Sequence, residues 1–167
     1  MRAQGSQQKQ ADAPEGRNVD EQEVVIGVGK SAFERAKVAL TMWRHFEQGW
    51  IEVFPTLAAV VPDTVVAVLV RHLGFWSMNG CRVVYQIAGD DSREFGFAYG
   101  TLTNHAEIGE EIFKVSLRPG TGEVSYVIRA VSRPRALLAR LAYPVTRSLQ
   151  ARFRRDSAAA MGRAIAG

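Results

Sequence analysis

Along much of the chain, hydrophobic and polar positions alternate with a period of two, which is typical of half-buried β-strands. Such strands are predicted at 64–72, 81–88, 94–102, 108–117 and 123–131. Turn residues separate them, including Gly74, Asn79-Gly80 and Pro119-Gly120. Because the connections are short, successive strands are expected to run antiparallel.

A different pattern precedes this meander. After a short strand or extended arm at 24–29, apolar residues recur at helical spacing, namely Phe33, Ala36, Leu40 and Trp43. Ser31 and Glu34 predict a capping box at the start of this helix. Residues 50–54 then predict one further strand, which Pro55 closes.

A long amphipathic helix is predicted after the last strand. It is expected to open at Ser132-Arg133-Pro134, because proline suits the first helical turn. Its apolar stripe consists of Leu137, Leu138, Leu141, Val145, Leu149 and Phe153. Pro144 is expected to kink it.

This order of elements predicts an α+β domain with a curved antiparallel sheet of about six strands. The C-terminal helix is the element long enough to cover the concave face. That arrangement is the helix-grip, START-like fold, in which the space between sheet and helix often holds a ligand. Residues 1–22 lack large apolar side chains and are predicted to form a disordered tail, leaving 23–167 as one domain.

Several classes of protein are disfavoured by composition. Cys81 is the one cysteine among 167 residues, which excludes an internal disulfide and a zinc site built on paired thiolates. No apolar stretch is long enough to span a bilayer or to follow Met1-Arg2 as a secretory signal. A cytoplasmic protein without a bound cofactor or metal is therefore expected.

Charge is concentrated near the C-terminus. Residues 133–167 contain one acid, Asp156, and eight arginines: Arg133, Arg135, Arg140, Arg147, Arg152, Arg154, Arg155 and Arg163. Such a helix could bind nucleic acid or an anionic membrane, or the arginines could simply solubilise an exposed face. Both interpretations stay open at the level of the sequence.

The hairpin formed by 94–102 and 108–117 carries the main candidate for chemistry. A five-residue turn after Leu102 sets partners whose residue numbers sum to 210, so that Tyr99 faces Glu111 and Phe97 faces Phe113. The aromatic face must point inward, and it takes Glu111 with it. A carboxylate there is costly unless it is protonated or paired.

Two roles are open for Glu111. It could be a general acid or base with a raised pKa. Alternatively, it could be structural, accepting a hydrogen bond from Tyr99 or pairing with an arginine such as Arg82. Two alternatives are also open for Arg152 and Asp156. They form either a surface ion pair or a polar anchor beneath the sheet.

Two further side chains lie at predicted turns or strands of this region. His105 and Glu107, at the tip of the hairpin, could mark the mouth of a pocket or half of a metal site, although a polar turn is the favoured explanation. Cys81 alternates with Arg82 and is expected to be a buried, inert thiol.

Three stretches together resemble a known family. They are Asn79-Gly-Cys-Arg-Val-Val-Tyr85; Gly96-Phe-Ala-Tyr-Gly-Thr-Leu102 with His105, Glu107 and Gly109-Glu-Glu111; and Ser132-Arg-Pro134 with Phe153-Arg-Arg-Asp-Ser157 and Met161. The chain resembles uncharacterised protein family 0548 of bacteria and plants from about Val24 to Met161. The resemblance implies one domain and assigns to the family motif Arg82, Tyr99, Thr101, His105, Glu107, Glu110 and Glu111.

Three functions are compatible with these features. The first is binding of a small hydrophobic molecule between sheet and helix, lined by Tyr85, Phe97, Tyr99, Thr101, Phe113 and Tyr126, with Glu111 and Arg82 or Arg152 at a polar end. The second is an enzyme in the same pocket (a cyclase, dehydratase or hydrolase) with Glu111 or His105 as acid or base. The third, less favoured, is binding of nucleic acid or anionic membrane by the arginine-rich helix. The ligand, the reaction and the oligomeric state are not determined by the sequence.

Overall fold

The structure, a computed structural model, describes residues 18–88, 93–102, 107–134 and 143–166. Its centre is one sheet with the strand order β1-β7-β6-β5-β4-β3-β2, in which every neighbouring pair is antiparallel. The strands are β1 (Asn18–Val28), β2 (Ile51–Phe54), β3 (Val65–His72), β4 (Phe75–Ala88), β5 (Glu94–Thr101), β6 (Glu107–Leu117) and β7 (Glu123–Pro134). The predicted antiparallel sheet is confirmed, with seven strands in place of about six.

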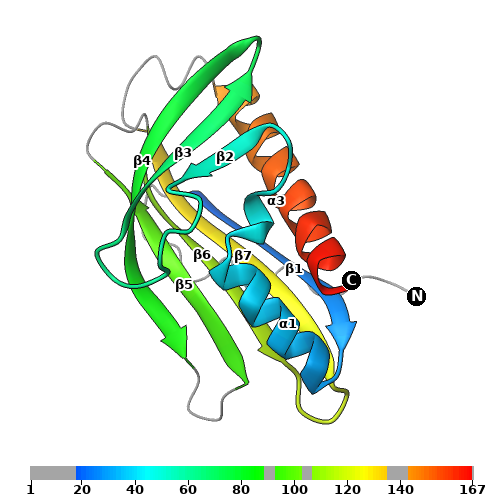
Figure 1. Cartoon of the computed structure of the whole chain (residues 1–167). Coiled ribbons are helices and arrows are strands. Elements are labelled where there is room, and N and C mark those ends of the chain that lie inside the picture. The colour runs from blue at the N-terminus through cyan, green and yellow to red at the C-terminus, as the bar shows by residue number, and fades with distance from the viewer. Residues whose placement is uncertain (1–17, 89–92, 103–106, 135–142, 167) are drawn as a thin grey trace.

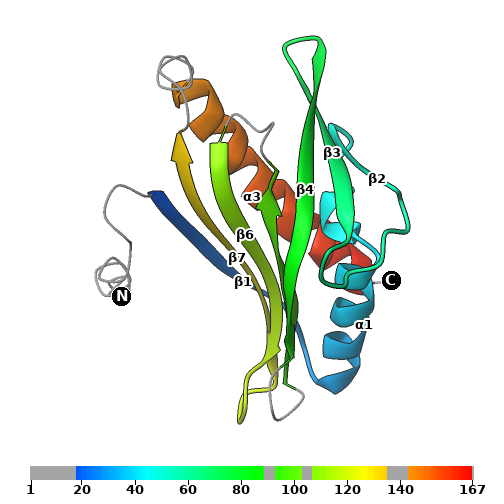
Figure 2. The same ribbon diagram turned by 90° about the vertical axis from the view of Figure 1, so that its left-hand side faces the viewer.

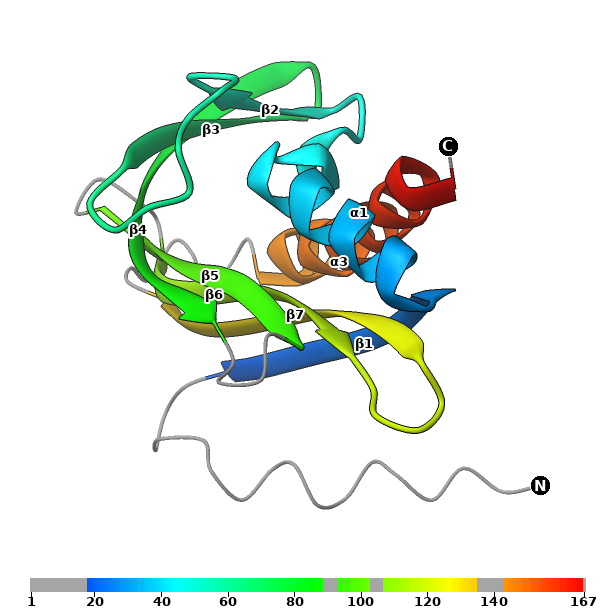
Figure 3. The ribbon, with the colours of Figure 1, turned by 60° about the horizontal axis from the view of Figure 1, so that its bottom comes forward.

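The sheet curls around the helices, as Figure 1 and Figure 3 show. The helices are α1 (Lys30–Thr41), the 3₁₀ turn η1 (Arg44–Phe46) and α3 (Tyr143–Ala166). The predicted cover by the C-terminal helix is therefore present. The C-terminal helix is not the whole cover, because α1 and η1 also lie inside the curl, beside α3.

The core lies between the concave face and these helices. The apolar stripe predicted for the first helix is buried, with Phe33, Ala36, Leu40 and Trp43 each at most 3% exposed. The sheet and α3 contribute further core side chains, among them Phe97, Phe113, Val115, Tyr126, Ile128, Phe153 and Met161. Burying one such side chain contributes about 1.5–3 kcal/mol to the free energy of unfolding.

Two polar contacts fix α3 against the rest of the molecule. The hydroxyls of Tyr126 on β7 and Ser157 on α3 lie 2.9 Å apart inside the core. Near the edge of the sheet, the Trp50 indole Nε1 donates to Asp156 Oδ2 at 3.1 Å. The position of the terminal helix is thereby set by hydrogen bonds as well as by apolar packing.

The ends of α1 differ from the prediction. Its N-cap is Gly29, with φ of 88° and no side-chain cap, so the capping box is wrong. Ser31 lies inside the helix instead, and its Oγ accepts a hydrogen bond from Arg35 at 2.8 Å. After α1, Trp43 takes a left-handed conformation with φ of 57°, which turns the chain into η1.

Three predicted boundaries are also wrong. The predicted tail extends too far along the chain, because residues 18–22 form the beginning of β1. Residues 1–17 lie outside the described residues. Of the two turn signals predicted between the strands at 64–72 and 81–88, Gly74 is confirmed, because the turn falls at Leu73-Gly74, whereas Asn79-Gly80 lies within β4.

The strand β7 continues to Pro134, so the predicted start of the last helix is a strand end. Pro144 is the second residue of α3 as described, and the kink predicted there stays a prediction because residues 135–142 lie outside the described residues. Leu137, Leu138 and Leu141 lie outside the described residues.

In Figure 2, the end of the β3–β4 hairpin that carries its turn, at the top of the view, extends beyond the helices.

Candidate functional site

A row of polar side chains crosses the concave face. Ala130 on β7 lies opposite both Asp20 on β1 and Glu111 on β6, and Glu111 lies opposite Tyr99 on β5. Directly paired residues share one face of a sheet. Asp20, Glu111 and Tyr99 therefore point to the same side, toward α3, and we call them the polar row.

The predicted pairing of Tyr99 with Glu111 is confirmed, as is that of Phe97 with Phe113. The Tyr99 hydroxyl donates a hydrogen bond to Glu111 Oε2 at 2.8 Å. Tyr99 is 7% exposed, whereas Glu111 is only partly buried. Glu111 is thus a half-buried residue at the border of the packed core.

Burial determines the protonation of Glu111. It raises the pKa of this carboxyl to about 7, against the opposing effects of the Tyr99 hydrogen bond and the positive charge of Arg154. The negative charge of Asp20 adds to the rise. The raised pKa agrees with the acid or base role left open by the sequence, and the Tyr99 hydrogen bond agrees with the structural role, so both roles stay open.

Arginines of α3 neutralise Asp20, the far end of the polar row. Arg147 donates two hydrogen bonds to its carboxylate, one of them to Oδ1 at 2.8 Å. Arg154 Nη1 lies 3.7 Å from Oδ2, and both charged side chains are about 15% exposed. The hydrogen bond from Arg147, together with the charges of Arg154 and Arg147, lowers the pKa of Asp20 despite its burial.

Cys81 lies next to the polar row, opposite Thr101, and is 2% exposed. Burial, and then the negative charge of Glu111, raises the pKa of its thiol to about 12. A thiol with that pKa is protonated at neutral pH and is a poor nucleophile. The prediction of a buried, inert cysteine is confirmed.

Aromatic rings form the wall beside the polar row. The Phe46 ring on η1 lies 6.3 Å from the Tyr99 ring and 5.3 Å from Phe153 on α3. Farther along the sheet, three predicted ligand contacts are at most 1% exposed: Phe97, Phe113 and Tyr126. They belong to the packed core, so they are separated from solvent.

Tyr85 does not face the interior, contrary to the prediction. The register of β4 and β5 shifts between Val83 and Tyr85, which reverses the alternation and turns Tyr85 to the outer face. There it is 37% exposed, and its hydroxyl donates to Glu110 Oε1 at 2.9 Å. The hairpin thus carries two Tyr–Glu pairs on opposite faces.

The predicted arginines also lie elsewhere. The side chain of Arg82 is 53% exposed on the outer face and lies 3.8 Å from Asp63. Arg152 is exposed, stacks over the Trp50 ring at 4.4 Å and donates to Asp156. Neither arginine reaches Glu111, and Arg154 is the cation whose charge acts on it.

Of the two remaining predicted site residues, Thr101 lies at the last position of β5. Thr101 is partly buried, and its Oγ1 accepts a hydrogen bond from the Gly109 amide at 3.1 Å. His105 lies outside the described residues, so its predicted role stays a prediction.

His45 is a polar core residue that the sequence reasoning missed. It is fully buried, and neither ring nitrogen has a hydrogen-bond partner. Its ring lies 4.5 Å from that of Phe113 and 4.6 Å from that of Phe46. Burial lowers the pKa of His45 to about 3, so the ring is neutral at ordinary pH. No signal around His45 in the sequence distinguishes it from an exposed histidine.

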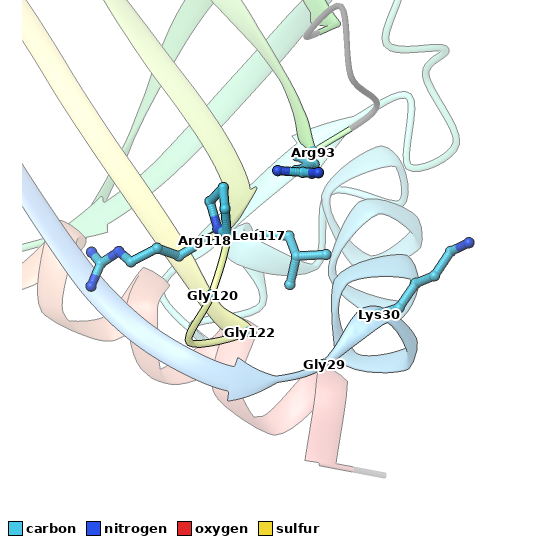
Figure 4. A pocket seen from close by; sticks show the side chains of 8 residues that line it. Gly29, Lys30, Arg93, Leu117, Arg118, Gly120 and Gly122 are labelled. Atoms are coloured by element: carbon cyan, nitrogen blue, oxygen red, sulfur yellow. The ribbon is translucent and has the colours of Figure 1, made fainter.

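A surface pocket of about 360 Å³ lies at the other end of the molecule, where α1 begins (Figure 4). Its lining includes Lys30, Leu117 and Arg118. Figure 4 shows the side chains of Lys30 and Arg118 extending in opposite directions, and Arg118 pairs with Glu23 and Glu123. Lys30 and Arg118, two of the three cations of the lining beside Arg93, point apart, so we take the polar row as the better candidate site.

Two classes of site receive no support from the described ranges. Within them, no three His, Cys, Asp or Glu side chains gather as a metal site would require. None of the helices described for the chain has the length and apolar character needed to cross a membrane.

Comparison with known proteins places the chain in a family. Residues 2–160 match the family described as "Domain of unknown function (DUF1990)". The chain belongs to this family. Among DUF1990 relatives, the UPF0548 protein of Dictyostelium discoideum is 34% identical over 157 residues, covering 89% of this chain and 73% of the relative. The UPF0548 protein of Arabidopsis thaliana is 35% identical over 142 residues, covering 83% of this chain and 68% of the relative. The resemblance inferred from the motifs is confirmed.

Solved structures show the same fold at much lower identity. The Zhui aromatase/cyclase of a Streptomyces species has a TM-score of 0.59 at 14% identity, covering 89% of this chain and 93% of its own. Ara h 8.0201 has a TM-score of 0.57 at 16% identity, covering 91% of this chain and 100% of its own. Norcoclaurine synthase from Thalictrum flavum, in complex with dopamine and hydroxybenzaldehyde, has a TM-score of 0.55 at 9% identity. The match covers 88% of this chain and 85% of the synthase chain. These DUF1990 residues therefore adopt the helix-grip fold.

Proposed function

We propose that this DUF1990 protein binds a small, largely apolar molecule at the open end of its concave face. The observation that carries the proposal is Glu111, a partly exposed carboxyl on an aromatic face that is hydrogen-bonded by Tyr99. Small-molecule sites typically combine apolar walls with a few polar groups that fix orientation. Tyr99, Phe46 and Phe153 supply the wall, and Glu111 supplies the polar group.

The fold neighbours support the class of ligand. One of them is an aromatase/cyclase, and another holds dopamine and hydroxybenzaldehyde, which are small aromatic compounds. Their low identity transfers no residue role. The proposed contacts are Tyr99, Thr101 and Glu111, with His105 retained from the sequence. A cytoplasmic location, consistent with a free buried thiol, is part of the same proposal.

Acid–base catalysis at Glu111 is the second candidate, and its pKa is the observation that favours it. A general acid or base works best when its pKa lies close to the working pH. With a pKa raised to about 7, Glu111 can both donate and accept a proton near neutrality. A cyclisation or dehydration of a bound molecule would require such a group.

Native mass spectrometry of the protein purified from its own host tests the binding function. A small molecule is expected to co-purify with the wild type, with lower occupancy in Glu111→Gln and Tyr99→Phe. The matched controls are Glu110→Gln and Tyr85→Phe, which alter the pair on the outer face. No co-purified molecule, or equal occupancy in all five proteins, contradicts the proposal.

Once the ligand is identified, the same variants separate binding from catalysis. If Glu111 only orients the ligand, Glu111→Gln weakens binding and no product forms with any variant. If it catalyses, product formation falls by about 10²–10⁴-fold in Glu111→Gln while ligand affinity persists. Glu110→Gln is expected to leave both measurements unchanged.

A further inference from the structure

The end of the β3–β4 hairpin exposes an unusual density of apolar side chains. Leu73 is 81% exposed, Phe75 72%, Trp76 49% and Met78 73%. Single exposed apolar residues are normal, whereas a contiguous group marks a surface that contacts something else. We call Leu73, Phe75, Trp76 and Met78 the apolar tip.

The backbone of the tip is strained without an internal reason. Leu73 has φ of 48° and Gly74 has φ of 81°, a pair of positive values that favours asparagine and glycine. Leucine at such a position strains the backbone, and because its side chain points into solvent, burial does not offset the strain. A residue that breaks a local rule without compensation inside the fold is expected to be functional.

The apolar groups surround the tip on both faces of the hairpin. Alternation places Phe75 on the face of Cys81, and Trp76 and Met78 on the opposite face. Phe75 is nevertheless exposed, because the hairpin extends past the helices that cover the sheet (Figures 1 and 2). A flat protein surface could cover only one of these faces, whereas a fluid apolar medium can cover both.

Behind the tip lies a cation beside an aromatic ring. The guanidinium of Arg71 lies 5.8 Å from the centre of the Trp76 ring, and Arg71 is exposed. Tryptophan and arginine together are favoured at the level of lipid headgroups, where the ring is half immersed and the cation meets phosphate. The net charge of the chain is +4, which adds long-range attraction to an anionic surface.

We propose that the apolar tip inserts into the surface of an anionic phospholipid bilayer, with Arg71 against the lipid phosphates. The insertion is shallow, on the order of 5–10 Å, as for other interfacial elements. This contact uses a different surface from both the arginine-rich helix and the polar row. It therefore stands independently of the proposed function at Glu111.

Tryptophan fluorescence reports directly on this contact. Trp76 is the exposed member of the three tryptophans, since Trp43 and Trp50 are 3% and 4% exposed. The full chain is mixed with vesicles of phosphatidylcholine, alone or with an equal amount of phosphatidylglycerol. With the anionic vesicles we expect co-flotation, a blue shift of the emission and quenching by brominated acyl chains. Trp76→Phe should abolish the shift and the quenching.

A double variant tests whether the tip carries the binding. Leu73→Ser with Phe75→Ser is expected to reduce flotation with anionic vesicles by at least about tenfold, because two apolar insertions are lost. Its circular dichroism and Tm should match the wild type, since both side chains are exposed. Leu57→Ser, which alters a 76% exposed leucine outside the hairpin, is the control and should bind normally.

Three outcomes overturn the proposal. The first is a wild type that neither floats with anionic vesicles nor shifts its emission. The second is a double variant that binds as well as the wild type. The third is that, without lipid, the wild type sediments as a dimer and the double variant as a monomer. The tip would then be a contact between copies of the chain.

Discussion

The hairpin of β5 and β6, with β4 beside it, places the same pair of residue types in two opposite environments. Tyr99 and Glu111 meet on the concave face at 2.8 Å, and Tyr85 and Glu110 meet on the outer face at 2.9 Å. The two pairs differ in burial, and desolvation of a buried carboxyl disfavours its charged form. The inner pair therefore has chemistry that the outer pair lacks, and the outer pair serves as its natural control.

Glu111→Gln is expected to change how stability depends on pH. The pKa of Glu111 is about 7 in the folded chain and near 4.5 in the unfolded chain, so the folded chain holds the proton more tightly. Its stabilising contribution is complete below about pH 4.5 and is lost as pH rises to 7, at most about 3 kcal/mol. The glutamine variant, always neutral, should exceed the wild type in urea denaturation at pH 8 but not at pH 4.5. A wild type and variant with parallel pH profiles would contradict this, and Glu110→Gln should follow the wild type.

His45→Phe is expected to protect the protein from acid. The pKa of His45 is lowered from 6.5 to about 3, so the unfolded chain takes up a proton first as pH falls. The wild type should lose about 2 kcal/mol of unfolding free energy at pH 5 through this group, and the variant should not. The variant also removes two buried, unsatisfied nitrogens, so it should be at least as stable at pH 8. Guanidinium denaturation of both proteins at each pH compares them directly, and an equal acid loss in both would refute the explanation.

Among the elements, alternation predicted the strands whose two faces differ clearly. The β5–β6 register was predictable because aromatic and small residues alternate across one short turn. Tyr85 was placed on the wrong face because the β-bulge before it leaves no trace in the pattern of apolar residues. The start of β1 was taken for a tail because Asp20, Glu21 and Gln22 are polar, although partners far along the chain hold them.

Asp20→Asn is expected to loosen β1 from α3. Arg147 and Arg154 both neutralise this carboxylate, and removing its charge leaves two partly buried arginines without their anion. We expect a loss of about 2–4 kcal/mol of unfolding free energy, measured by urea denaturation. The control is Glu23→Gln on the same strand, whose exposed pair with Arg118 should be worth less than about 1 kcal/mol. Equal effects at both positions would show that Asp20 is not an anchor.

Gly96→Ala is expected to disturb the pairing of β5 with β6. A Cβ at this position would lie 2.3 Å from the Phe113 carbonyl oxygen and 2.9 Å from Lys114 Cα, both backbone atoms. The strands must separate locally, which should cost about 3 kcal/mol or more in thermal or chemical unfolding. At Gly100 the nearest atom is the flexible Val84 Cγ2 at 3.3 Å, so Gly100→Ala should cost about 1 kcal/mol or less. The reverse order of the two costs would contradict the described geometry.

For the whole molecule, the sequence predicted the layers better than the site. Tyr99 and Glu111 were predictable because they belong to one hairpin. Asp20, His45 and Arg154 were not, because β1, η1 and α3 bring them to the concave face from distant parts of the chain. Local patterns carry no information on such encounters, and the family motif includes Tyr99 and Glu111 but neither Asp20 nor His45.

Stability is expected to fall from the centre of the sheet toward the apolar tip. In hydrogen exchange, the amides of Phe97, Phe113 and Ile128 should be the slowest, since the core covers them and strands flank them on both sides. Leu73 should exchange within the dead time of the experiment. A tip as protected as the sheet centre in the free protein would show that another contact already covers it.

The pairing of the first strand with the last has a consequence for biosynthesis. The strand β1 leaves the ribosome first, yet its partner β7 ends only at Pro134. At about 5–20 residues per second, β1 waits on the order of ten seconds for that partner. During this interval Asp20 also lacks Arg147 and Arg154, which are translated later still. Closure of the sheet at β1 is therefore a late event, which follows the synthesis of β7 and α3, and chaperones that act on unfinished chains have their opportunity at this edge.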